Sequence, residues 1–240
     1  MKTRLDRLLV ERGLVESREK AQALIMAGEV LVNRQKAAKP GQSVEEDVAV
    51  EVLARPPYVS RGGFKLVGAL DRFAIDPSGK VCLDIGASTG GFTDVLLQRG
   101  AARVHAVDVG AGQLAWSIRT DPRVVVHENV NARELPFDTI GELADLIVCD
   151  VSFISVTMIL PAAVPLLRPE GQMVILIKPQ FEAGRGQVGK GGIVRDPVVR
   201  QAACDRVRHA VEQCGFATDI MESPIPGAEG NREFLLYAHH

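Results

Sequence analysis

The sequence predicts an α/β protein in which a Rossmann-like sheet of seven strands follows a small α+β unit. Its 240 residues suffice for one full-sized domain and a small one, and 46% of them are hydrophobic, enough for a packed core. Beyond residue 60, short β-rich runs alternate with helical patterns, which is typical of a mostly parallel sheet covered on both faces. Because the first 54 residues lack this alternation, we expect two unequal domains.

Two helices are predicted in the N-terminal domain, residues 1–54. The first lies between Arg4 and Arg12, where apolar residues are spaced for one helical face. The second begins at Ser17, whose hydroxyl can cap free amides, and ends near Gly28. The positions expected to face the core are Leu5, Leu8, Leu9, Ala21, Leu24 and Ile25.

Short strands and a stiff connection complete this domain. The run Glu29–Arg34 alternates like a half-buried strand, and the turn at Pro40-Gly41 leads to a second run, Val48–Val52. The prolines in Arg55-Pro56-Pro57-Tyr58 block a helix and stiffen the chain. Residues 55–59 are therefore predicted to be a linker.

The second domain, residues 60–240, contains the runs that predict the large sheet. The last two runs have only a loop between them, so that pair can be antiparallel. Seven strands ending in such a hairpin are typical of methyltransferases among doubly wound sheets. The predicted strands are Val81–Ile85, Arg103–Val109, Val124–Glu128, Leu146–Val151, Met173–Lys178, Ala217–Met221 and Glu233–Ala238.

Charge and hydropathy indicate the kind of partner and the compartment. The net charge of the chain is only -2, but the first 39 residues carry +4, which suggests a polyanionic partner. No apolar stretch approaches the roughly 18 residues of a membrane span, and the N-terminus lacks the apolar segment of a signal peptide. The four scattered cysteines form no C-x-x-C pair and predict buried, reduced thiols. We expect a cytoplasmic protein without a membrane or metal site.

The glycine turn after the first strand of the sheet predicts a cofactor without phosphate. Its spacing, Gly86-x-x-x-Gly90-Gly91, differs from the G-x-G-x-x-G of dinucleotide sites. Asp84 stands just before the turn, where a carboxylate would repel phosphate but suit a cation. S-adenosylmethionine carries an ammonium group and a sulfonium and has no phosphate. The sequence therefore predicts S-adenosylmethionine as the cofactor.

Later strand ends supply the rest of the predicted cofactor site. Asp108 ends the second strand, where an acid commonly accepts hydrogen bonds from ribose, and Asn129 follows the third, where it could pair with adenine. The predicted cofactor-binding residues are Asp84, Gly86, Ala87, Ser88, Gly90, Gly91, Phe92, Asp108, Val109, Asn129, Val130 and Asp150.

Two other motifs resemble known sites without matching them. The stretch Gly184–Gly191 spells G-x-x-x-x-G-K, but Gly191 replaces the Ser or Thr that would hold magnesium. Arg55-Pro56-Pro57-Tyr58 resembles the Asn/Asp-Pro-Pro-Tyr of amino-group methyltransferases, but it lacks the amide or acid and precedes the first strand of the sheet. Neither a nucleoside triphosphate site nor an amino-group methyltransferase site is expected.

Four charged residues are the predicted catalytic group. Asp150 follows the fourth strand and Lys178 the fifth, so both can meet over the cofactor at the carboxyl edge of the sheet. Lys65 and Glu233 are further candidates outside these strands. Together they resemble the Lys-Asp-Lys-Glu tetrad of FtsJ-like RNA ribose 2'-O-methyltransferases, in the same order along the chain.

The N-terminal domain supports a closer resemblance. Arg4-Leu5-Asp6, Ser17-Arg18, Lys20-Ala21, Gly28-x-Val30-x-Val32-Asn33 and Lys39-Pro40 are similar to ribosomal-protein S4-type RNA-binding domains. An S4-type domain followed by an FtsJ-like domain resembles the TlyA, or hemolysin-A-like, family of ribosomal RNA 2'-O-methyltransferases across essentially the whole chain.

The resemblance implies a ribose 2'-hydroxyl, of cytidine in ribosomal RNA, as the methyl acceptor. Lys178 would act as base or oxyanion partner, Asp150 would orient it, and Glu233 would hold Lys65 or the ribose. The expected partner is ribosomal RNA or a ribosomal subunit, not DNA. The predicted RNA-binding residues are Arg4, Arg7, Arg18, Lys20, Arg34, Lys36, Arg61, Arg185 and Lys190.

Two other functions stay open on the sequence alone. One is base methylation of RNA, although no Asn/Asp-Pro-Pro-aromatic motif or motif-borne catalytic cysteine supports it. The other is an RNA-binding protein or hemolysin without methyltransferase activity. Binding of S-adenosylmethionine would distinguish the enzyme from the binder.

Overall fold

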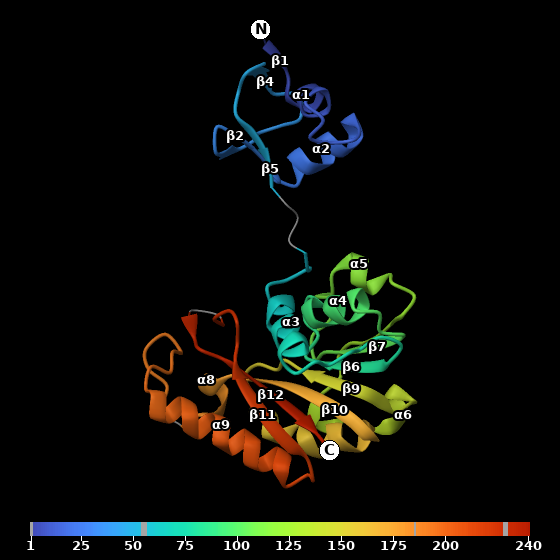
Figure 1. Cartoon of the computed structure of the whole chain (residues 1–240), viewed down its shortest axis with the longest axis vertical. Coiled ribbons are helices and arrows are strands. Elements are labelled where there is room, and N and C mark those ends of the chain that lie inside the picture. Colours follow the sequence, from blue (N-terminus) through green and yellow to red (C-terminus); the bar gives the residue numbers. More distant parts are fainter. Residues whose placement is uncertain (1, 54–56, 185, 228–229) are drawn as a thin grey trace. The chain divides into compact units, whose positions relative to one another are not determined.

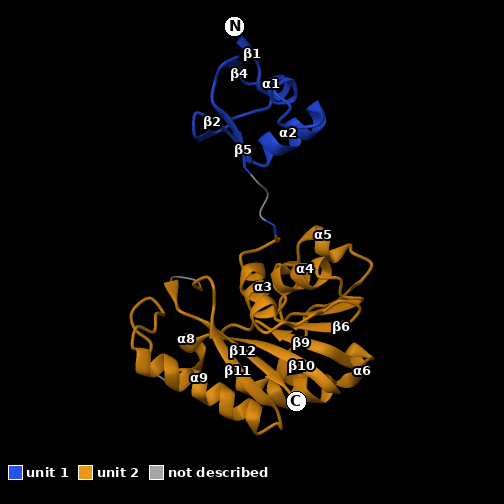
Figure 2. Ribbon diagram, in the orientation of Figure 1, with its two compact units in different colours: residues 1–57 blue, residues 58–240 orange. Residues whose placement is uncertain are grey.

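In the computed structural model the chain forms two compact units, residues 1–57 and 58–240 (Figure 2). The structure describes residues 2–53, 57–184, 186–227 and 230–240. Residues 55 and 56 of the predicted linker lie outside the described part. Tyr58 and Val59, also predicted there, contact the second unit: the Tyr58 ring packs on Phe64 at 5.4 Å, and the Val59 amide donates to Asp94 Oδ2 at 2.8 Å.

Unit 1, residues 1–57, is built on two helices and two small antiparallel sheets. One sheet pairs β1 with β4, and the other has the order β3-β2-β5. The predicted apolar positions of both helices are buried together, and Ser17 Oγ accepts from the Lys20 amide at 3.2 Å as the expected cap. The elements are β1 (Lys2–Arg4), α1 (Leu5–Glu11), α2 (Arg18–Met26), β2 (Val30–Val32), β3 (Gln35–Lys36), β4 (Ser43–Glu45) and β5 (Val50–Val52).

The strand predicted over Glu29–Arg34 is shorter in the structure. It ends at Val32 because Asn33 and Arg34 adopt φ values of 50° and 66°. Two successive left-handed residues make a tight hairpin turn, so the chain reverses directly into β3.

The large sheet of the second unit has seven strands in the order β11-β12-β10-β9-β6-β7-β8 (Figure 1). All neighbouring pairs are parallel except those of β12, which is antiparallel to both β10 and β11. The Rossmann-like prediction with an antiparallel C-terminal hairpin is confirmed. The strands are β6 (Val81–Ile85), β7 (Arg103–Val107), β8 (Val124–His127), β9 (Ala144–Cys149), β10 (Leu167–Ile177), β11 (Ala217–Glu222) and β12 (Phe234–His239).

Helices cover both faces of this sheet (Figure 1). Buried residues of α3, α4 and α5 pack with one set of strand side chains, and those of α6, α7 and α9 pack with the other. Each fully buried Leu or Ile contributes about 1.5–3 kcal/mol, so these layers hold the strand ends in fixed positions. The helices are α3 (Gly62–Arg72), α4 (Gly91–Gln98), α5 (Trp116–Arg119), α6 (Phe137–Ile140), α7 (Leu160–Ala163), α8 (Pro179–Glu182) and α9 (Pro197–Glu212), with 3₁₀ turns η1 (Ala132–Glu134), η2 (Val156–Met158) and η3 (Val164–Leu166).

The cysteines are all free thiols, and three of the four are buried as predicted. Burial raises the pKa of Cys82 and of Cys204 to about 12, so neither is reactive at neutral pH. The prediction is wrong for Cys214, which is exposed just beyond the end of α9.

No helix in the described ranges is both long enough and apolar enough to span a bilayer.

Candidate active site

The glycine turn between β6 and α4 forms the floor of an open cleft of about 200 Å³. Gly86 has a φ of 88°, and a side chain there would overlap the carbonyl oxygen of Asp150 on the neighbouring strand end. Gly90, with a φ of 94°, precedes the first residue of α4, and a Cβ there would lie 2.9 Å from Leu114. Glycine is therefore required for both the left-handed backbone and the close approach.

The predicted residues of this turn line the cleft, with two exceptions. Gly86, Ala87, Ser88, Gly91 and Phe92 all contribute to its wall. Gly90 sits behind it against α5, and Asp84 is fully buried beneath the turn.

Asp84 occupies an unusual electrostatic position. Its Oδ2 accepts a hydrogen bond from the Thr93 hydroxyl at 2.7 Å, while Oδ1 has no hydrogen-bonding partner in the described part of the chain. Burial, reinforced by the charges of Asp150 and Asp108, raises the pKa of Asp84 to about 7. A positive charge above the turn would stabilise the ionised form of this carboxyl.

Asp150 and Lys178 meet in the cleft. They follow β9 and β10, two adjacent parallel strands whose carboxyl ends lie at the same edge. Lys178 Nζ lies 2.5 Å from Asp150 Oδ1 and donates to Ser152 Oγ at 2.8 Å. The lysine side chain is only 11% exposed, so its ammonium is held in one position by two oxygen atoms.

Lys65 and Glu233 form a second ion pair at the same cleft. Lys65, in the second turn of α3, lines the cavity, and its Nζ lies 2.5 Å from Glu233 Oε2. Glu233 immediately precedes β12; because this strand runs against β10, it begins at the edge where the parallel strands end. A side chain at Gly227 would overlap the Glu233 carboxylate, so that glycine leaves room for it. The four predicted catalytic residues thus gather around one cavity.

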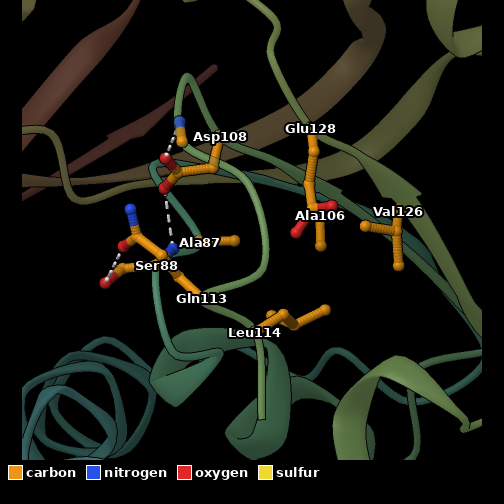
Figure 3. Close-up of a pocket in the computed structure, with 9 residues that line it drawn as sticks. Ala87, Ser88, Ala106, Asp108, Gln113, Leu114, Val126 and Glu128 are labelled. Atoms are coloured by element: carbon orange, nitrogen blue, oxygen red, sulfur yellow. Dashed lines mark hydrogen bonds between the residues drawn. The ribbon is translucent and has the colours of Figure 1, made fainter. Parts of the chain in front are cut away.

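A second, smaller cavity adjoins the first, since Ala87 and Ser88 line both. Figure 3 shows the Asp108 carboxylate beside the glycine turn, where it accepts from the amides of Ser88 at 2.8 Å and Gly110 at 2.7 Å. The rest of the wall is largely apolar and is formed by Ala106, Leu114 and Val126. The two cavities together suit an elongated ligand with one polar and one flat apolar end.

Three predicted cofactor residues line neither cavity. Val109 is 73% exposed, Val130 packs against the hydrophobic core, and Asn129 is exposed with a φ of 57°. The prediction is off by about one residue because β7 ends at Val107 and β8 ends at His127. Glu128 lines the cavity instead of Asn129.

Sequence reasoning also missed Gln113, Leu114, Glu128 and Ser152 as cavity-lining residues. Ser152 stands two residues after Asp150, a spacing that could have identified it. Gln113 and Leu114 come from the loop before α5, which no motif marks. The hydrogen bond from the Gly112 amide to the Glu128 carboxylate, at 2.7 Å, lowers the pKa of Glu128 and keeps it ionised.

The predicted RNA-binding residues lie on both units, and each unit is considered by itself. In unit 1, Arg7 faces Glu11 at 3.5 Å, Lys20 binds Glu16 at 2.9 Å, and Arg4 and Arg18 both contact Asp6. The remaining members, Arg34, Lys36, Arg61 and Lys190, are exposed, and Arg185 lies outside the described residues.

Within the described ranges, no group of three or more His, Cys, Asp or Glu side chains is arranged to hold a metal ion.

Comparison with known proteins assigns both units. Residues 3–50 match the S4 domain model, and residues 58–240 match the model of the FtsJ-like methyltransferases. The 16S/23S rRNA (cytidine-2'-O)-methyltransferase TlyA of Mycobacterium tuberculosis is 49% identical over 239 residues, which cover 98% of this chain and 89% of that protein. Hemolysin A of Brachyspira hyodysenteriae is 45% identical, with 98% of each chain covered.

A solved structure agrees over the full length. A hemolysin-named protein from Streptococcus thermophilus superposes with a TM-score of 0.74 at 44% identity, covering 99% of this chain and 88% of the other. The chain belongs to the FtsJ-like methyltransferase family, in the TlyA or hemolysin-A-like group that carries an S4 domain before the methyltransferase domain.

Proposed function

We propose that this chain transfers a methyl group from S-adenosylmethionine to a ribose 2'-hydroxyl of ribosomal RNA. The single observation that carries the proposal is the convergence of two lysine–acid pairs, Lys178 with Asp150 and Lys65 with Glu233, on one cleft beside a glycine turn. The name of the relative from M. tuberculosis supports the same acceptor and suggests cytidine as the nucleoside.

The two adjoining cavities fit S-adenosylmethionine. The adenosine end would occupy the smaller cavity against Leu114 and Val126, with its ribose beside Asp108 or Glu128. The amino-acid end would lie over the glycine turn, above the buried Asp84 and its unpartnered Oδ1. When bound, the cofactor supplies a methyl group on a positively charged sulfur, which a nucleophile displaces in line.

Lys178 has the central role in activating the acceptor. A ribose hydroxyl becomes a good nucleophile only when its proton is removed and the charge on oxygen is stabilised. Lys178 Nζ would contact the 2'-oxygen and take its proton, and Asp150 would stabilise the resulting ammonium. Ser152 holds the same nitrogen at 2.8 Å and so fixes its direction.

Lys65 and Glu233 would position the nucleoside. Lys65 lines the cleft and is held from behind by the Glu233 carboxylate, which is 2% exposed. The remaining N–H groups of Lys65 are therefore available to a ribose or phosphate oxygen. An ammonium fixed in this way gives orientation at little entropic cost.

The S4 domain would supply affinity for the RNA backbone. The first 39 residues carry a charge of +4 although the whole chain is at -2. Contacts to phosphate give binding without reading sequence, so the choice of nucleotide rests with the shape of the ribosomal RNA or subunit. A ribosomal substrate would place the protein in the cytoplasm.

The decisive experiment locates the transferred methyl group. The protein is incubated with methyl-labelled S-adenosylmethionine and ribosomal RNA, free and within subunits, and the RNA is then hydrolysed with alkali. Methylation of the 2'-oxygen blocks cleavage, so we expect the label in an alkali-resistant dinucleotide. Label recovered on a base in a mononucleotide would contradict the proposal.

Variants of the ion pair test the assigned residues. Lys178→Ala and Asp150→Ala should each lower methyl transfer by roughly 100-fold or more, while cofactor affinity measured by calorimetry changes little. Lys80→Ala is the matched control, because Lys80 immediately precedes β6 and so lies at the opposite edge of the sheet. Wild-type turnover in Lys178→Ala would remove Lys178 from the mechanism.

A further inference from the structure

A buried carboxylate lies between two surface arginines in unit 1. Asp6, in the first turn of α1, is fully buried. Its Oδ1 accepts from Arg4 Nε at 3.0 Å, and its Oδ2 accepts from Arg4 Nη2 at 2.8 Å, Arg18 Nε at 3.0 Å and Gln22 Nε2 at 2.9 Å. The hydrogen bonds from Arg4 hold the pKa of Asp6 well below its usual range. One charged carboxylate thus connects the end of β1 with α1 and α2.

Both arginines keep unused donors at the surface. Their side chains are 47% and 51% exposed for Arg4 and Arg18. Within the described part of the chain, their hydrogen bonds all go to Asp6: Arg4 uses Nε and Nη2, and Arg18 uses Nε. A guanidinium has five N–H groups, so most donors of both side chains remain free for an outside acceptor.

The loop before β4 fixes Arg4 on a further side. A Cβ at Gly41 would lie 3.1 Å from Arg4 Nη1 and 3.3 Å from its Cζ, so the guanidinium rests against the bare glycine backbone. This loop is itself tied to α1, because Pro40 O accepts from the Asp6 amide at 3.2 Å and Gln42 O from the Leu5 amide at 2.9 Å. The guanidinium is therefore held by both a carboxylate and a backbone surface.

We propose that Asp6 is a positioning residue that holds Arg4 and Arg18 as a preformed binding site for an RNA phosphate. The inference rests on the RNA substrate of the proposed function and identifies one of its contacts. Two guanidinium groups and one carboxylate leave this cluster, the Asp6 cluster, with a net positive charge. Guanidinium groups match phosphate oxygens in geometry, and groups already held in place lose less conformational entropy on binding.

Substitution of Asp6 gives a test in which the two explanations predict opposite signs. If Asp6 only adds negative charge near RNA, Asp6→Asn should tighten binding, because it removes one repulsive charge. If Asp6 positions the arginines, the same variant should weaken binding, by roughly tenfold for the loss of one charged contact. The measurement is fluorescence anisotropy of a short labelled RNA hairpin with the full-length protein, at low and moderate salt.

Glu16→Gln is the matched control. Glu16 lies in the same unit, is exposed and binds the single cation Lys20 at 2.9 Å, so its substitution makes the same change in charge without touching the Asp6 cluster. We expect RNA affinity that is unchanged or slightly higher. Equal behaviour of Glu16→Gln and Asp6→Asn would overturn the proposal.

A double-mutant cycle separates positioning from general damage to the unit. In a background with Arg4→Ala and Arg18→Ala, Asp6→Asn should produce no further loss of affinity, because the groups it positions are gone. A merely structural role would give the same loss in both backgrounds. Thermal unfolding followed by circular dichroism shows whether unit 1 stays folded.

Arg18→Lys keeps the proposal testable even if Asp6→Asn does not fold. It preserves the charge, but a lysine cannot contact Asp6 and present a second planar edge at once, so affinity should fall several-fold. Wild-type affinity in Arg18→Lys, or no RNA binding by the wild type at low salt, would refute the site. Binding of RNA without methyl transfer would contradict only the proposed function, and methyl transfer with an unaffected Asp6→Asn variant would contradict only this inference.

Discussion

At the scale of single residues, the site depends on charges that are held below the surface. Lys178 and Lys65 each have a carboxylate at 2.5 Å, so neither ammonium is free to move with solvent. Asp84 differs because it has no cationic partner and retains an unpaired oxygen. A buried carboxyl of this kind responds to any cation that binds above it.

The affinity for S-adenosylmethionine should therefore depend on pH through Asp84. Its pKa of about 7 in the free protein would fall when a cationic ligand binds, so binding releases a proton near neutral pH. Affinity should rise as the pH increases towards about 7 and level off above it, since the ionised form binds the cation better. Calorimetry in buffers of different ionisation enthalpy measures the proton release.

Asp84→Asn should remove both effects. The variant should bind the cofactor with an affinity that varies little between pH 6 and 8, and it should release no proton. A pH dependence identical to that of the wild type would show that another group is responsible. His127 is a candidate in that case, because burial lowers its pKa and it lies just before Glu128.

At the scale of elements, the edge formed by the strand ends brings the site together. β9, β6 and β10 end side by side, and the antiparallel β12 begins at the same edge (Figure 1). The turn after β6 passes so close to the end of β9 that a side chain at Gly86 would meet the Asp150 carbonyl. The conformation of this turn therefore also sets the position of Asp150.

Gly86→Ala should lower both stability and cofactor affinity. The left-handed φ of 88° costs a non-glycine residue about 1–2 kcal/mol, and the overlap with Asp150 adds to it, so we expect a loss of roughly 3 kcal/mol or more. Gly79→Ala is the matched control: its φ is 69°, but nothing lies within 4 Å of the added Cβ, so only the cost of the backbone conformation applies. Chemical denaturation gives both values, and equal losses would mean that the close approach is unimportant.

At the scale of the whole molecule, the two units divide affinity from chemistry. Unit 1 carries the excess of positive charge and the Asp6 cluster, whereas the second unit carries both cavities and both lysine–acid pairs. Phosphate contacts release counterions and so respond to salt. The buried pairs of the cleft are screened far less.

RNA binding and cofactor binding should consequently differ in their response to salt. Between about 50 and 200 mM salt we expect RNA affinity to fall by roughly tenfold or more, while S-adenosylmethionine affinity changes less than about twofold. Anisotropy and calorimetry on the same preparation measure the two. An RNA affinity that does not respond to salt would argue against binding through phosphates.

Much of the fold could be predicted because it depends on local patterns. Apolar runs separated by helical segments identified all seven strands of the large sheet, and leucine spacing with the Ser17 cap identified both helices of unit 1. Errors occurred at element ends, where one turn of backbone decides the outcome. The hairpin at Asn33 and Arg34 and the early ends of β7 and β8 are the examples.

The sequence by itself determined the kind of sheet, the glycine turn and the four charged residues, because alternation, glycine spacing and strand-end positions are properties of short stretches. Only the tertiary structure decided that Lys178 pairs with Asp150 and Ser152 and that Lys65 pairs with Glu233, 168 residues away. It also decided that Asp84 is buried below the turn and that Glu128 replaces Asn129 at the cavity wall. Such pairings depend on strand order and on the direction of β12, which bring together segments that no local pattern relates.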